Sequence, residues 1–221
     1  SKTSSVTATS ARNIVGLVVQ GSSATLDADN DIAGVEVRAS NAANLTAGQD
    51  INGSMIDATT ASLSADDSII GTTVGVWSSA ILDAGNSITG SNVTAKSGSV
   101  TLDATNFISN TDVSATTTVS LDAGLDVVGS SILAGGAVTV GDDADVRSLH
   151  TTDIVAGGAV GINLTQEMDG STVNSLAGVT VNANNVTNSA IDADGAIAVN
   201  ADTNITNSQF KGDLAGLRLG M

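Results

Sequence analysis

The sequence predicts an all-β fold, a single-stranded parallel β-helix of about 11 coils with three short strands in each coil. Consecutive blocks of 19 residues share one skeleton, as in Ala80–Gly98 (AILDAGNSITGSNVTAKSG) and Ser99–Thr117 (SVTLDATNFISNTDVSATT). A fixed repeat of roughly 20 residues is typical of solenoids, whose units stack on one another. Within each block apolar and polar residues alternate, which indicates strands, and no helical stripe persists along the chain.

The first strand of each coil is marked by an apolar residue, which in most coils is the Leu of a Leu-x-Ala run. Successive markers are 18 to 22 residues apart. Because side chains alternate along a strand, we expect the markers to face inward and to stack from coil to coil. The markers are Ala8, Leu26, Leu45, Leu63, Leu82, Leu102, Leu121, Val140, Ile162, Val181 and Val199.

The second and third strands follow at fixed distances from the first. After Leu82, Ile88 lies six residues further on and Val93 lies eleven, and we expect both to face inward. Gly90 lies between them, where most other coils have Gly or Asn. Because these residues tolerate positive φ, we expect a left-handed turn there. Asp83 is expected to face solvent.

These distances predict one solenoid domain over residues 1–221. Its coils lie near 5–23, 24–42, 43–60, 61–79, 80–98, 99–117, 118–136, 137–158, 159–178, 179–195 and 196–213, with a last strand over 214–221.

The repeat is irregular between Ser148 and Ile154, which are six residues apart where other coils have three. Val146 is expected to be the inward residue of the second strand here, and the spacing predicts an inserted loop. Insertions in solenoids emerge on one face, which is often the binding face. We therefore expect either a surface bulge without function or a site for a cell-surface receptor or glycan. The loop residues are Leu149, His150, Thr151 and Thr152.

The charge balance argues against two classes of partner. The chain has 7 Lys and Arg against 23 Asp and Glu, a net charge of −16. Nucleic acid and anionic membrane surfaces bind clustered basic residues, so neither is an expected partner. No apolar run approaches the roughly 18 residues that span a bilayer, so no membrane span is expected. The polar start predicts no signal peptide, which favours a processed or excised segment.

Outward acidic residues recur one place after the first-strand marker. Asp83, Asp103 and Asp122 are expected about 5 Å apart on adjacent coils, where like charges repel by roughly 1 kcal/mol per pair in water. Calcium would relieve this repulsion, but it takes roughly six to eight oxygen ligands, and the GGxGxD calcium repeat is absent. A solvated ladder without metal or other cofactor is therefore favoured over a calcium site. The Asn residues expected to form amide ladders at this position are Asn163, Asn182 and Asn200.

The sequence offers no set of catalytic residues. It has one His, His150, and neither Tyr nor Cys. Acid–base catalysis by paired carboxylates needs a cleft, and the repeat is not interrupted enough to build one. We therefore expect that the protein is not an enzyme.

Both ends of the chain fall on the first strand of a coil. Val6 and Ala8 begin the first coil, and Leu217 and Leu219 end the last strand. An exposed strand edge carries unpaired N–H and C=O groups that pair with other chains. We therefore expect either that the chain is an excised piece of a longer rod, or that its ends stack on a second copy, end to end in a homopolymer.

Repeats such as SVTLDATNFISNTDVSATT and TVSLDAGLDVVGSSILAGG resemble those of filamentous-haemagglutinin-like large exoproteins and adhesins, and the resemblance covers nearly the whole chain. It implies a right-handed parallel β-helix, secreted to or beyond the bacterial surface, that acts as an adhesive or structural fibre. The amino-terminal secretion domain of that family has Asn-Pro-Asn motifs, which a chain without Pro lacks. The resemblance therefore does not extend to the two-partner secretion route.

Two functions are expected from these observations. The first is a structural subunit of an extracellular filament or surface fibre, assembled by end-to-end stacking of uncapped β-solenoids. The second is a shaft or binding segment of a secreted haemagglutinin-like adhesin that recognises a host or cell-surface receptor. Both place the protein in the extracellular space or at the cell surface.

Overall fold

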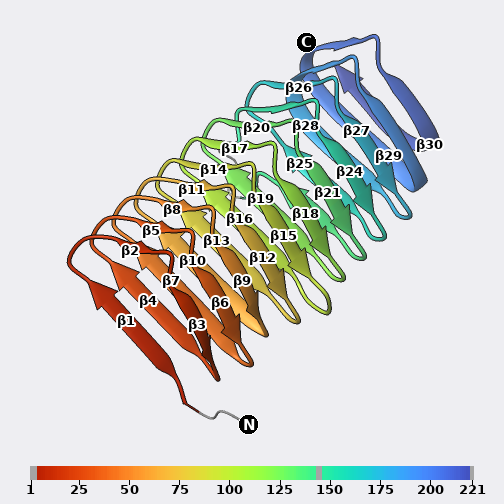
Figure 1. Cartoon of the computed structure of the whole chain (residues 1–221). Coiled ribbons are helices and arrows are strands. Elements are labelled where there is room, and N and C mark those ends of the chain that lie inside the picture. Colours follow the sequence, from red (N-terminus) through yellow and green to blue (C-terminus); the bar gives the residue numbers. More distant parts are fainter. Residues whose placement is uncertain (1–3, 143–145, 220–221) are drawn as a thin grey trace.

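A computed structural model describes residues 4–142 and 146–219 of the chain. Its 30 strands form one sheet that winds into a parallel β-solenoid of about 11 turns, and this described part contains no helix. Figure 1 shows the coils following one another along a rod, with the N-terminus at one end and the C-terminus at the other. The predicted fold class is confirmed. Within the same residues no helix is long and apolar enough to cross a membrane.

Most coils contribute three strands, and equivalent strands of successive coils form three stacks. The first stack contains β1 (Val6–Ser10), β4 (Ala24–Ala28), β7 (Ala42–Ala47), β10 (Thr60–Ala65), β13 (Ala80–Ala84), β16 (Val100–Ala104), β19 (Val119–Ala123), β22 (Val138–Val140) and β25 (Val160–Asn163). The second contains β2 (Ile14–Val15), β5 (Ile32–Ala33), β8 (Ile51–Asn52), β11 (Ile69–Ile70), β14 (Ser87–Thr89), β17 (Phe107–Ser109), β20 (Asp126–Val128), β23 (Ser148–His150) and β26 (Glu167–Asp169).

The third stack contains β3 (Val18–Gly21), β6 (Glu36–Ala39), β9 (Met55–Ala58), β12 (Thr73–Val76), β15 (Asn92–Ala95), β18 (Asp112–Ala115), β21 (Ser131–Ala134), β24 (Asp153–Ala156) and β27 (Thr172–Ser175). Longer strands near the C-terminal end run through the corners and join more than one stack. They are β28 (Val179–Thr187), β29 (Ala190–Thr206) and β30 (Gln209–Leu219).

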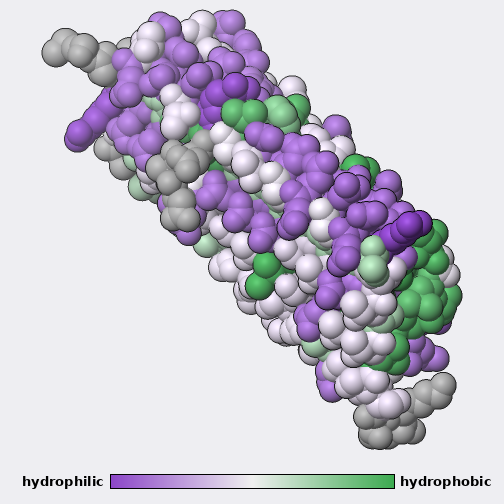
Figure 2. All heavy atoms as spheres, turned by 90° about the vertical axis from the view of Figure 1, so that its left-hand side faces the viewer, coloured by the Kyte–Doolittle hydropathy of each residue, from purple (hydrophilic) through white to green (hydrophobic). Residues whose placement is uncertain are grey.

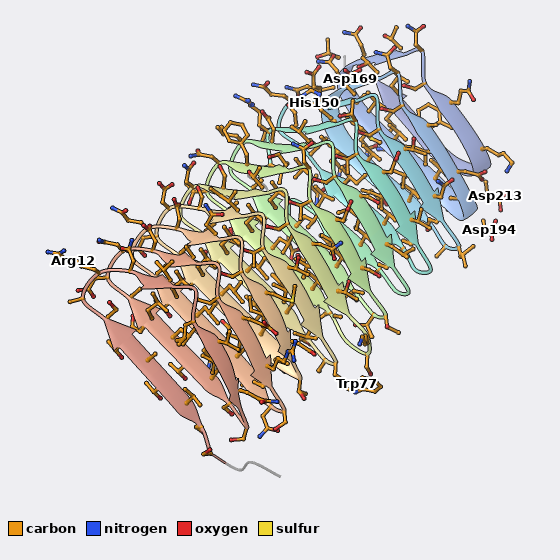
Figure 3. All side chains as sticks on the ribbon, viewed as in Figure 1. Arg12, Trp77, His150, Asp169, Asp194 and Asp213 are labelled. Atoms are coloured by element: carbon orange, nitrogen blue, oxygen red, sulfur yellow. The ribbon has the colours of Figure 1, made fainter. Side chains whose placement is uncertain are left out.

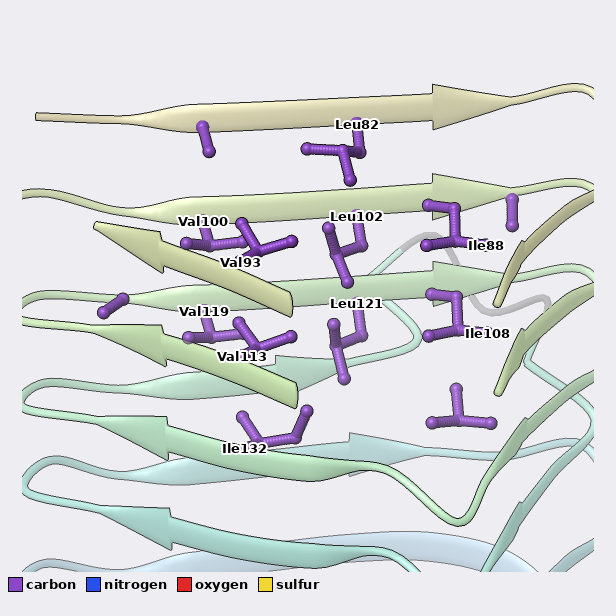
Figure 4. Close-up of a cluster of buried hydrophobic side chains, with 14 of the residues drawn as sticks. Leu82, Ile88, Val93, Val100, Leu102, Ile108, Val113, Val119, Leu121 and Ile132 are labelled. Carbon is purple, nitrogen blue, oxygen red and sulfur yellow. The ribbon is translucent and has the colours of Figure 1, made fainter. Parts of the chain in front are cut away.

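The core consists of apolar columns, because the parallel strands of successive coils pair in register. In the first stack, six Leu residues each pair with the counterpart in the next coil. Figure 4 shows part of this column beside the Ile and Val columns of the other stacks. Full burial of one such side chain contributes about 1.5–3 kcal/mol. The column consists of Leu26, Leu45, Leu63, Leu82, Leu102 and Leu121, none of them more than 1% exposed.

The turn between the second and third strands is left-handed, as predicted. Gly90 has a φ of 60° and Asn110, at the equivalent position, has a φ of 50°. Most side chains raise the energy of this conformation, so the position selects Gly and Asn. It recurs at Gly16, Gly34, Gly53, Gly71, Gly129, Gly170, Asn188 and Asn207.

The structure contradicts the predicted loop at Leu149, His150, Thr151 and Thr152. β23 pairs in register with β20 and β26, so Leu149 stacks between Val127 and Met168 in the second-stack column. Leu149 and Thr152 are fully buried. Thr151, with a φ of 46°, forms the left-handed turn of this coil.

The inserted residues lie earlier in the chain. Val140 and Leu149 are nine residues apart, whereas their partners Ile162 and Met168 are six apart, so three extra residues lie between the first pair. Part of this segment, 143–145, lies outside the described residues. The spacing misplaced the insertion because Val146, six residues after Val140, is also apolar and buried.

A column of buried Ser and Thr residues follows the left-handed turn, and the sequence reasoning missed it. The hydroxyl of Ser91 donates to the carbonyl of Thr89 at 3.3 Å and accepts the backbone N–H of Thr72 in the preceding coil at 3.2 Å. Because a buried N–H needs a partner, the hydroxyl satisfies a donor that the turn leaves outside the strand ladders. The same two bonds recur at Ser130, Ser171, Ser189 and Ser208.

Candidate functional site

The predicted outward column of Asp83, Asp103 and Asp122 is present. These residues pair in register across β13, β16 and β19, so they lie on adjacent coils. Nowhere in residues 4–142 and 146–219 do three or more His, Asp or Glu side chains form a group placed to hold a metal ion. The register establishes the adjacency of the three Asp residues, and no metal role is proposed for them.

The predicted amide ladder is confirmed. Asn182 donates from Nδ2 to Oδ1 of Asn163 at 2.7 Å, and Asn200 donates to Oδ1 of Asn182 at 2.7 Å. Each Asn therefore donates to the coil before it. The ladder ties successive coils together outside the backbone hydrogen bonds, in the manner of stacked amides in cross-β structures.

His150 lies in a polar cluster on the outward side of the second stack. Its Nε2 is 3.7 Å from Oε1 of Glu167, and Figure 3 shows it beside Asp169. Hydrogen bonds from Thr187 and Asn188, at 2.7 Å and 2.8 Å, together with the nearby His150, lower the pKa of the Asp169 carboxyl below its ordinary value.

Only two of the four residues predicted to bind a receptor or glycan reach the surface. Thr151 is exposed and His150 is half-buried, whereas Leu149 and Thr152 lie in the interior. A ligand at this position would therefore contact His150, Thr151 and the acidic neighbours of His150 rather than a protruding loop.

The terminal strands each have one side to which no other described strand pairs. β1 pairs with β4, and β30 pairs with β29. Val6 and Ala8 of β1 are half-buried and pack against the core. Leu217 and Leu219 of β30 pair through the backbone with β29, and their side chains lie outside the described residues.

The N-terminal coil exposes apolar side chains. Val15 is 67% exposed and Val18 is 68% exposed. Leu17, half-buried, stands where most later coils carry the buried Ser or Thr. Figure 2 shows hydrophobic residues gathered near the lower end of the rod, which is the N-terminal end, while most of the visible flank is polar.

Exposed apolar side chains gather on the face formed by the third strands and the corners that follow them. Of the ten large apolar residues exposed in the described part of the chain, six lie there. They are Val18, Met55, Leu133, Val155, Trp77 and Leu176. Figure 3 shows Trp77 and Asp194 along this edge, across the rod from His150. Because gathered apolar surface marks interaction sites, this face is the leading candidate.

A groove of about 440 Å³ lies on this face, within the range of about 300–1,000 Å³ that is typical of ligand sites. Leu133, Val155 and Leu176 line its apolar part, and Asp192, Asp194 and Lys211 line its charged part. The sequence reasoning missed this site, because its residues come from five coils. The available signal was an apolar residue at the outward position of two successive third strands, Leu133 and Val155.

Comparison with known proteins identifies no relative, since no family model, no curated protein and no solved structure matches the chain. The fold and its register define the chain as a parallel β-solenoid repeat protein. Its membership of the haemagglutinin-like exoproteins stays a prediction from the repeats.

Proposed function

We propose that the chain is a structural subunit of an extracellular filament or surface fibre, built by end-to-end stacking of β-solenoid coils. The observation that carries the proposal is that β1, at one end of the rod, and β30, at the other, each have one side to which no other strand of the described residues pairs. Open strand edges pair readily with another chain. A head-to-tail contact that does not close produces an open filament.

The surface chemistry favours growth along the rod axis. Val6, Ala8 and Leu17 pack against the core at the N-terminal coil but are only half-buried, so contact with another coil would remove further apolar area from water. The chain as a whole has a net charge of −16, which opposes association of rods side by side.

The hydrogen bonds of β1 suggest a variant that blocks its open edge. Val6 donates its N–H to the carbonyl of Ser23 at 2.9 Å, so the polar backbone groups of Val6 face β4. Because successive residues of a strand direct these groups to opposite sides, the N–H of Thr7 points to the open edge. Thr7→Pro removes that donor and places a ring against an incoming strand. Thr7→Val keeps the donor and is the matched control.

Electron microscopy of the purified chain tests the proposal. The wild type and Thr7→Val are expected to form fibres that lengthen with protein concentration. Thr7→Pro is expected to keep the circular dichroism of the wild type and to remain as short rods. A wild-type chain that sediments as a single rod at every concentration, including the highest attainable, overturns the filament.

A second candidate function is a shaft or binding segment of a secreted adhesin that recognises a host or cell-surface receptor, favoured by the apolar face around Leu133 and Val155. Binding of labelled chain to cells tests it, with the variant pairs His150→Ala/Thr151→Gly and Leu133→Ser/Val155→Thr. Gly suits the φ of 46° at Thr151. Loss of binding in one of the two double variants locates the receptor site. If both double variants bind cells as well as the wild type does, neither position is the receptor site.

A further inference from the structure

The groove on the third-strand face begins where the outward column changes from polar to apolar residues. By register this column runs from Thr94 and Ser114 to Leu133 and Val155. Thr and Ser are ordinary solvent-facing strand residues, whereas Leu133 is 52% exposed and Val155 is 45% exposed. Two large apolar side chains therefore lie next to each other at the surface. Neither the packing of the core nor the pairing of the strands requires apolar residues at these two positions.

The corner next to these residues keeps the groove open. A Cβ on Gly157 would lie 2.2 Å from the carbonyl oxygen of Gly135, so the close approach of the two backbones excludes a side chain there. Leu176 follows at the corner of the next coil, where its N–H donates to the carbonyl of Ala156 at 3.0 Å and its side chain is 71% exposed. The groove thus has a corner without side chains beside a projecting apolar wall.

The groove runs along the rod axis rather than around the coil. The outward column continues by register from Val155 through Asn174 and Asp192 to Lys211. A second hollow of about 480 Å³ adjoins the first, since Asn174, Asp192 and Lys211 line both. An elongated hollow of this kind fits an extended segment better than a compact ligand.

The C-terminal part of the groove is acidic. Nζ of Lys211 lies 2.6 Å from Oδ2 of Asp192, so these two charges neutralise each other. The contact also raises the pKa of the Lys211 ammonium. Asp194 is exposed and also lines the groove, which leaves the lining with a net negative charge. A cationic partner is therefore complementary to it.

We propose that this groove binds an extended polypeptide segment of another protein, in which an apolar side chain is followed by Lys or Arg. The apolar side chain contacts Leu133, Val155 and Leu176, and the basic group lies near Asp194. The Asn174 amide, between the two parts of the groove, hydrogen-bonds the segment. A second copy of this chain is disfavoured as the occupant, because the groove lies on the flank of the rod and the net charge of −16 opposes association of rods side by side.

Fluorescence anisotropy with a labelled acetyl-Leu-Lys-Val-Lys-amide peptide and the full chain tests the apolar part. The wild type is expected to bind, and Leu133→Ser/Val155→Thr/Leu176→Ser is expected to weaken binding about tenfold or more. Ser and Thr occupy the same outward column in preceding coils, so the first two substitutions suit the fold. Ile81→Thr is the matched control, because it removes an apolar side chain that is 49% exposed on the first stack.

Three charge variants test the acidic part of the groove. Two of them are expected to change the affinity for the peptide in opposite directions. Asp194→Asn is expected to weaken binding of the peptide about two- to fivefold, and Lys211→Gln to strengthen it by a similar factor. Asp27→Asn removes an exposed carboxylate on the first stack and is expected to leave binding unchanged. A peptide with Gln in place of Lys is expected to bind Asp194→Asn and wild type equally.

Equal affinity of the wild type and the triple apolar variant overturns the proposal. The same loss in Ile81→Thr or Asp27→Asn also overturns it, because binding then follows total charge or total apolar area. A concentration-dependent dimer that the triple variant abolishes would make a second copy the occupant and overturns the assignment to another protein. The filament test with Thr7→Pro changes the edge of β1 and leaves the groove intact, so the two proposals fail separately.

Discussion

The backbone N–H of Thr72 donates to the hydroxyl of Ser91 on the next coil at 3.2 Å. The hydroxyl of Ser91 in turn donates to the carbonyl of Thr89, two residues before it, at 3.3 Å. Thr72 and Ser91 both follow a left-handed Gly, and both are buried. A hydroxyl therefore connects the turns of neighbouring coils where no strand ladder runs.

Ser91→Ala is expected to lower the free energy of unfolding by about 1–3 kcal/mol, because it leaves the buried N–H of Thr72 without a partner. Urea unfolding followed by circular dichroism measures this loss. Ser97→Ala, at an exposed corner, is the control and should change stability by less than about 0.5 kcal/mol. If Ser91→Ala and Ser97→Ala have the same free energy of unfolding, a buried hydroxyl of this column contributes no more to stability than a solvent-exposed Ser does.

The columns of the core could be predicted because each coil repeats them at nearly constant spacing. Leu82, Ile88 and Val93 all face inward, and the turn at Gly90 is left-handed. Spacing alone could not locate the insertion, because Val146 and Leu149 are both apolar and buried and either could occupy the second-stack column. Pairing of Leu149 with Val127 and Met168 decided between them, and pairing depends on three-dimensional contact rather than on local pattern.

The groove could not be predicted for a different reason. Its apolar and charged parts, such as Val155 and Lys211, belong to coils far apart in the sequence. The open corner depends on the backbone approach at Gly157, which composition does not reveal. Once the register is known, the site is marked by the change along one outward column from the polar Thr94 and Ser114 to the apolar Leu133 and Val155.

Gly90→Ala is expected to lower the free energy of unfolding by about 1–2 kcal/mol. A Cβ at Gly90 would meet no atom within 4 Å, so the cost comes from the φ of 60° alone. Gly90→Asn should lose less, because Asn tolerates this conformation, as Asn110 does at φ 50°. These losses are measured by chemical denaturation.

Gly161→Ala provides the matched control for the turn. Gly161 also has open space around its Cβ position but is not among the residues with positive φ. Ala should therefore leave stability unchanged or raise it by about 0.4–1 kcal/mol, since it restricts the unfolded chain. Equal destabilisation at both positions would contradict a conformational origin.

The pKa of Asp169 predicts a contribution to stability that depends on pH. Because its pKa is lowered in the fold, chiefly by the hydrogen bond from Thr187, the charged form stabilises the folded state above the ordinary Asp pKa of about 3.9. This contribution is lost as pH falls through the lower, folded-state pKa. Thr187→Val should raise the Asp169 pKa toward its ordinary value, as carboxyl NMR titration measures. An unchanged titration would exclude the hydrogen bond as the main cause.

Leu102→Ala is expected to lower the free energy of unfolding by about 2–5 kcal/mol, because it opens a cavity between Leu82 and Leu121. Ile81→Ala, on the outward side of β13, removes an exposed side chain and should cost much less. A solenoid coil contacts only its neighbours, so hydrogen exchange should accelerate first in β13, β16 and β19 and later in β4. Equal acceleration of hydrogen exchange in all coils would show that the coils unfold as one cooperative unit. End-to-end stacking of chains would then extend that unit.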